Sequence, residues 1–154
     1  MDRKKLIENA YDVFGVFKKP LRCTIHDDDC PDCKDHEKTL KAATRETLST
    51  EEVDTIAWSP LPNMNAYAMA YFLPRLIELA VEKAIDRDGD PYMMRFINMV
   101  LGGPDGKRFR LLGKEHKYSI FQTLLFLREH YLKIVEEDCW DRELDMAIKR
   151  WKSH

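Results

Sequence analysis

The sequence predicts an all-α protein: a single-domain compact bundle of six or seven helices with a long, metal-pinned loop near the N-terminus. Apolar side chains recur at helical spacing in most segments. Proline and glycine stand where these segments begin or end, and no pair of alternating apolar runs indicates a sheet. The 154 residues fit one domain spanning 1–154, because a domain usually holds about 100–200 residues.

The N-terminal third is predicted to contain three helices and a polar loop. Residues 4–17 carry apolar side chains at helical spacing. The irregular stretch 21–32 follows, and its Pro31 suits the first turn of a short helix over 31–43. Residues 49–57 open with serine and glutamate at capping-box spacing, which predicts a third, short helix.

The centre of the fold is predicted at residues 64–86. The run 66–73 (AYAMAYFL) is apolar on all sides, which is typical of a helix enclosed by its neighbours. Pro74 then either kinks this helix or opens a second one at its first turn.

The next segments alternate between helix and loop. Asp90 is expected to cap a helix that continues to about residue 101. The turn-rich stretch 104–113 alternates arginine with apolar residues around Phe109, which leaves a short strand open as an alternative to a loop.

The C-terminal third is predicted to hold two amphipathic helices. The first covers residues 115–136, and its spacing places Leu124 and Leu127 on the buried face. The second carries apolar residues at helical spacing as far as Trp151, and Asp138 is expected to cap it.

Charge and leader patterns limit the classes of partner. The chain has 25 Lys and Arg against 27 Asp and Glu, so its net charge is −2. This balance favours neither a nucleic acid nor an anionic membrane as partner. Acidic residues interrupt the N-terminal segment where a signal peptide would need an apolar run, so we expect a cytoplasmic protein. Its four cysteines would then be thiols or metal ligands.

Three of the four cysteines and two histidines lie close together in the predicted loop and the start of the next helix. Zinc prefers four thiolate or imidazole ligands in a tetrahedron, and two cysteines separated by two residues can both reach one ion. We therefore expect a zinc site formed by Cys23, Cys30, Cys33 and His36, with His26 as the rival fourth ligand.

Two other interpretations of this segment remain. The cysteines could be thiols without a ligand, or Cys30 and Cys33 could act as a thiol oxidoreductase with Cys30 attacking. Four aspartates lie between residues 27 and 32, and their negative charge disfavours a thiolate. The same aspartates are less costly beside a bound dication.

The segment Cys30-Pro-Asp-Cys33-Lys-Asp-His36-Glu37, followed by Ala70-Tyr71-Phe72-Leu73-Pro74, resembles a group of small bacterial proteins of unassigned function. These proteins pair a Cys-x-x-Cys-x-x-His-(Asp/Glu) segment with a helix that contains a Tyr-x-Leu-Pro-like block. The resemblance covers at most residues 30–80. It implies a bacterial origin and supplies no catalytic residues.

The sequence favours a non-enzymatic protein that binds another protein and uses a structural zinc ion. No arrangement of catalytic groups can be assembled from the sequence. An immunity or antitoxin protein is a specific alternative, because the run Asp27–Asp29 could mimic an anionic substrate in a basic active site of a toxin. The oxidoreductase is the enzyme alternative.

Overall fold

The computed structural model describes residues 1–53 and 58–152, and within them all regular structure is helical. The elements are α1 (Arg3–Phe14), α2 (Pro31–Ala42), α3 (Thr50–Val53), η1 (Leu61–Asn63), α4 (Ala66–Val81), α5 (Tyr92–Val100), η2 (Lys107–Phe109), α6 (Lys114–Glu137) and α7 (Asp141–Trp151). In the described part of the chain no strand forms, and the all-α prediction of six or seven α-helices is confirmed. None of the described helices is both long and apolar enough to cross a membrane.

Helix α4 forms the centre of the core. Its residues from Met69 to Pro74 are all buried, as the apolar run predicted. The side chain of Asn65 begins the helix by accepting a hydrogen bond from the N–H of Ala68 (2.9 Å). Of the two alternatives at Pro74, the opening of a second helix is wrong, since α4 continues through this residue as one helix. Helices α1, α5 and α6 all pack against α4.

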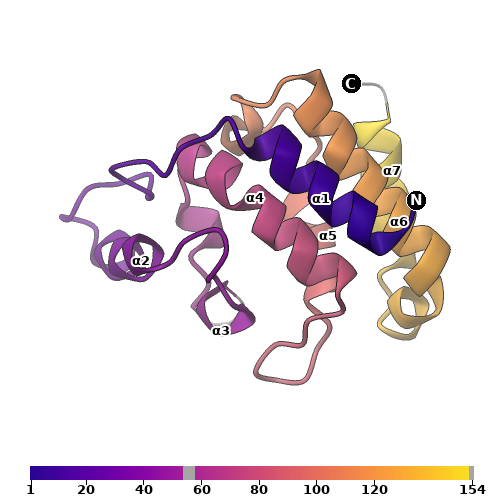
Figure 1. The fold of residues 1–154 in the computed structure, drawn as a ribbon. Helices are drawn as coiled ribbons and strands as arrows, with labels where there is room; N and C mark the ends of the chain where they lie inside the picture. The colour runs from indigo at the N-terminus through magenta and orange to yellow at the C-terminus, as the bar shows by residue number, and fades with distance from the viewer. Residues whose placement is uncertain (54–57, 153–154) are drawn as a thin grey trace.

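The C-terminal helices close the bundle on one side, where α1, α6 and α7 run together (Figure 1). Leu124 and Leu127 of α6 are fully buried, as predicted. Two buried aromatic side chains also tie the layers together through hydrogen bonds: Tyr131 donates to the carbonyl of Val81 (2.7 Å), and Trp151 donates to the carbonyl of Val100 (2.8 Å). Both bonds give a polar atom of a large ring a partner inside the core.

Helices α2 and α3 lie at the other end of the molecule, beside the loop that joins α1 to α2 (Figure 1). Half of the predicted capping box forms at the start of α3: the N–H of Ser49 donates to the carboxylate of Glu52, but the hydroxyl of Ser49 also donates to this carboxylate and does not accept from the N–H of Glu52. The predicted continuation of this helix through Ile56 and Ala57 lies outside the described residues.

Two predicted features of the loops differ from the structure. Residues 107–109 form the 3-10 helix η2, because Phe109 turns into the core and its N–H closes a turn on Gly106 (2.9 Å). A single strand there would have no neighbour with which to pair. Helices α5 and α7 also begin later than predicted, at Tyr92 and Asp141, so neither Asp90 nor Asp138 is an N-cap.

Candidate metal centre

The first turn of α2 brings two thiols to the same end of the helix. Cys30 is the N-cap residue with extended backbone, and Pro31 occupies the first helical position, where its missing N–H costs nothing. Cys33 lies one turn further and is fully buried, whereas Cys30 is half-buried. The sequence Cys-Pro-Asp-Cys therefore places one sulfur near solvent and one inside the protein.

The loop before α2 brings an imidazole to these sulfurs. Nδ1 of His26 lies 3.5 Å from Sγ of Cys33. The backbone carbonyl of His26 accepts two hydrogen bonds from the guanidinium of Arg22, one from Nε (2.9 Å) and one from Nη2. These bonds set the loop conformation that turns the exposed imidazole toward α2.

His26, Cys30 and Cys33 together have the spacing of a metal site. Their ligand atoms all lie within 4.8 Å of one another. In a zinc tetrahedron with Zn–S of about 2.3 Å and Zn–N of about 2.0–2.1 Å, sulfur and nitrogen are about 3.5 Å apart and two sulfurs about 3.8 Å apart. The observed separation of Cys33 Sγ and His26 Nδ1 matches the first of these values. The three atoms could therefore hold a metal ion.

Asn63 also contacts the buried sulfur of Cys33. Its side-chain N–H donates to Sγ of Cys33 over 3.5 Å, and its backbone carbonyl accepts from the N–H of Ile25 (2.9 Å). Such outer contacts orient a ligand and hold negative charge on its sulfur. The short helix η1, which ends at Asn63, thus contributes to the site.

The two other ligands predicted from the sequence lie outside this cluster. Cys23 is fully buried in the hydrophobic core, where burial, with the negative charge of Glu37, raises the pKa of its thiol to about 11. His36 packs its ring against Trp58, with centroids 4.6 Å apart. Burial lowers the pKa of His36, and this effect outweighs the negative charges of Asp32 and Asp35, which act to raise the pKa. The cluster thus contains His26, the rival ligand, in the position expected for His36.

Glu37 anchors the loop to α2, and sequence reasoning missed it. Glu37 is 5% exposed, and its carboxylate accepts hydrogen bonds from the N–H groups of Cys23 (3.0 Å) and Thr24 (2.9 Å) and from the hydroxyl of Thr24 (2.9 Å). Lys41 lies 3.8 Å away on the solvent side. The available signal was the spacing of Cys33 and Glu37, four residues apart on one helix face.

Asn65 holds the same loop from the start of α4. Its side-chain N–H donates to the carbonyl of Arg22 (2.7 Å), and its backbone N–H donates to the carbonyl of Cys23 (2.9 Å). Together with Glu37, these bonds fix residues 22–25 through the protein alone. The next residue, His26, is held through its backbone carbonyl by the guanidinium of Arg22.

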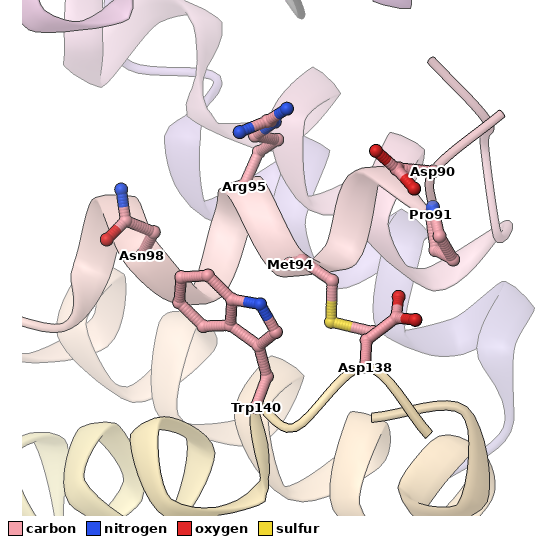
Figure 2. A pocket seen from close by; sticks show the side chains of 7 residues that line it. All are labelled: Asp90, Pro91, Met94, Arg95, Asn98, Asp138 and Trp140. Carbon is pink, nitrogen blue, oxygen red and sulfur yellow. The ribbon is translucent and has the colours of Figure 1, made fainter. Parts of the chain in front are cut away.

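A hollow of about 300 Å³ lies between α5 and the turn that joins α6 to α7 (Figure 2). Met94 and Trp140 give it an apolar wall, and the carboxylates of Asp90 and Asp138 lie beside them. Arg95, on the same helix as Met94, forms an ion pair with the buried carboxylate of Asp86 (3.6 Å). The residues lining this hollow include none of the metal-site cysteines or histidines.

The arrangement as a whole is that of a helical protein with a candidate metal centre built from one loop histidine and the two cysteines at the start of α2. The thiols can bind a soft or borderline ion, or they can form a disulfide with each other. No family model, no curated protein and no solved structure matches this chain.

Proposed function

We propose that this protein binds zinc through His26, Cys30 and Cys33, and that the ion fixes the loop before α2 as a non-enzymatic binding site for a partner protein. The observation that carries the proposal is the convergence of these three ligand atoms within 4.8 Å. Two thiolates and an imidazole suit zinc, whereas calcium and magnesium require oxygen ligands. The fourth position of the tetrahedron is open to water or to a ligand from the partner.

Exposed apolar side chains support the proposal of a protein partner. Leu21 is 94% exposed and Ile25 55% exposed, on either side of the anchored residues Cys23 and Thr24. Trp58, which packs on His36 of α2, is 46% exposed. Large exposed apolar side chains are common at protein-binding surfaces.

The acidic run in the same loop supports a basic partner, as in an immunity protein that neutralises a toxin. Asp27, Asp28 and Asp29 are all exposed. Arg22 pairs with Asp28 at 3.3 Å, and the carboxylate of Asp27 accepts a hydrogen bond from the N–H of Asp29 (3.1 Å). Such charges would speed association with a basic surface and make it sensitive to salt.

Metal analysis of protein purified without a metal-affinity tag tests the zinc proposal. We expect one zinc ion per chain in the wild type and loss of most of it in His26→Gln and Cys33→Ser. His36→Gln and Cys23→Ser are the matched controls and should retain the ion. Zinc that survives His26→Gln but not His36→Gln would instead support the ligand set expected from the sequence.

A thiol oxidoreductase is the second candidate, because Cys30 lies at a helix N-terminus with Cys33 buried one turn behind it. Helix N-termini favour thiolates in redox enzymes of this kind. Oxidised glutathione would convert the two thiols to a disulfide and take up two electrons and two protons. Rapid, reversible loss of two thiols by mass spectrometry in zinc-free wild type, absent in Cys30→Ser, would favour this candidate. Full zinc occupancy with no such reaction would exclude it.

A further inference from the structure

A hollow beside the start of α4 has the size of a small-molecule site. Its volume is about 490 Å³, within the range of about 300–1,000 Å³ that is usual for ligand pockets. Residues 24–25 of the loop, Pro62 of η1, the first turn of α4 and the region of η2 line it. The metal-site residues His26, Cys30 and Cys33 are not among them, so the two sites are separate.

The hollow collects positive charge in a chain whose net charge is negative. Lys107, Arg108 and Arg110 line it together, and its lining contains no aspartate or glutamate. Among the residues that the structure describes, none of these three side chains takes part in an ion pair. Three neighbouring cations without a counterion repel one another, and an anion between them would remove that cost.

Arg108 carries this argument furthest, because its guanidinium is half-buried and has no hydrogen-bond acceptor in the described chain. Burial lowers the pKa of Arg108, which reflects the cost of removing its charge from water. Arg110 is oriented by the ring of Tyr67, with its guanidinium carbon 5.7 Å from the ring centroid. Both arginines are thus placed at the hollow before any ligand arrives.

The backbone adds donors at the same place. The side chain of Asn65 caps the N–H of Ala68, but the N–H groups of Ala66 and Tyr67 have no acceptor within the described residues. Both residues line the hollow. They open the sixteen-residue helix α4, whose N-terminus carries the positive end of the helix dipole.

We propose that this hollow binds the phosphate monoester of a small molecule whose ring or apolar part lies against Ile25 and Tyr67. A phosphate monoester carries about −1.5 to −2 charges at neutral pH, which suits two guanidinium groups and an ammonium better than a carboxylate does. Ile25 and Tyr67 are 55% and 54% exposed, so an apolar group laid on them would bury surface that water now covers. The proposal does not depend on metal binding.

Titration of the full chain with phenyl phosphate, monitored by backbone amide NMR, tests the proposal that the hollow binds a phosphate monoester. We expect saturable shifts at Ala66, Tyr67, Arg108 and Arg110. Inorganic phosphate should bind at the same residues more weakly, because it lacks the ring, and benzyl alcohol should not bind, because it lacks the charge. Benzoate that binds as tightly as phenyl phosphate would overturn the assignment to phosphate.

Substitutions separate the charge from the apolar contact. Arg108→Gln and Arg110→Gln should each weaken phenyl phosphate binding about tenfold or more, as expected for loss of a charge-assisted hydrogen bond. Tyr67→Ala should reduce binding of phenyl phosphate more than that of inorganic phosphate. Lys133→Gln, which removes an exposed cation of α6, is the control and should bind as the wild type does.

The variant Arg110→Gln keeps the test informative if Arg108→Gln fails to fold, since Arg110 is exposed. Absence of saturable shifts in the wild type, or undiminished binding in Arg110→Gln, would overturn the proposal. Repeating the titration with His26→Gln distinguishes this site from the metal centre. Phosphate binding should persist there, whether or not the zinc proposal holds.

Discussion

Removal of the Glu37 carboxylate should test how the loop before α2 is held. The substitution Glu37→Ala deletes the acceptor for the N–H groups of Cys23 and Thr24 and for the hydroxyl of Thr24. All three donors lie in the buried part of the loop, so water cannot readily replace the carboxylate. The expected effect therefore has two parts: loss of three charge-assisted bonds, and two N–H groups left without a partner, since the hydroxyl of Thr24 can still donate to the carbonyl of His26 (3.1 Å).

The magnitude follows from the burial of the donors. A hydrogen bond to a charged group contributes about 1.5–3 kcal/mol, and an unsatisfied buried donor costs about 1–3 kcal/mol. Relaxation of the loop and release of the buried charge reduce the sum, so we expect a loss of about 3–5 kcal/mol in the free energy of unfolding. For a domain whose stability is about 5–15 kcal/mol, this is a large fraction.

Urea unfolding followed by tryptophan fluorescence measures this loss. Hydrogen exchange of the Cys23 and Thr24 amides reports whether it is local. Glu136→Ala, an exposed glutamate of α6, is the matched control and should change stability by less than about 0.5 kcal/mol. A loss below about 1 kcal/mol in Glu37→Ala, with both amides still protected, would refute the anchoring role.

Three further predictions concern the core, a half-buried histidine and the metal. Leu124→Ala and Leu127→Ala should each lower the free energy of unfolding by about 2–5 kcal/mol in urea titrations, because both side chains are fully buried. A change below about 0.5 kcal/mol at both positions would contradict the packing of α6. Burial lowers the pKa of His116 below 6.5. One ring nitrogen of His116 accepts a hydrogen bond from the N–H of Gly113 (3.0 Å), and the other lies 3.1 Å from the carbonyl of Val13. As the pH falls, the histidine of the unfolded chain therefore binds a proton before that of the folded protein, so the free energy of unfolding should fall below about pH 6.5. His116→Gln should show a smaller fall between pH 7 and 5 than the wild type. Equal slopes in the two proteins would contradict this role of His116. Removal of zinc by a chelator should speed amide exchange at residues 26–33 but leave the Thr24 amide protected, because Glu37 and Asn65 hold Thr24. Equal loss of protection at Thr24 and at residues 26–33 would show that the ion holds the whole loop.

The sequence indicated the helices well where one strong pattern acted alone. The apolar run of α4 predicted a buried central helix, and the spacing of Leu124 and Leu127 predicted the inner face of α6. The starts of α5 and α7 were misplaced, because an aspartate near a helix start resembles a cap whether or not its side chain reaches a free N–H. Such a decision depends on backbone geometry over a single residue.

The residues of the candidate metal site could be predicted from the sequence only in part. Cys30 and Cys33 could be paired from their spacing, because helical geometry alone brings them together. The choice between His26 and His36 depended on the path of the loop, which Arg22, Asn63 and Asn65 set through contacts distant in sequence. Local spacing favoured His36, but its ring packs on Trp58.

The sequence by itself determined the helical class, the central position of α4 and the cysteine pair at the start of α2, because each follows from periodicity or spacing within one segment. The tertiary structure alone decided that Cys23 is a core residue, that Glu37 anchors the loop, and that Arg108 and Arg110 share a hollow with the first turn of α4. These outcomes depend on which segments meet in space. Periodicity specifies the buried face of a helix, but the partner of a buried polar group is specified only by the packed fold.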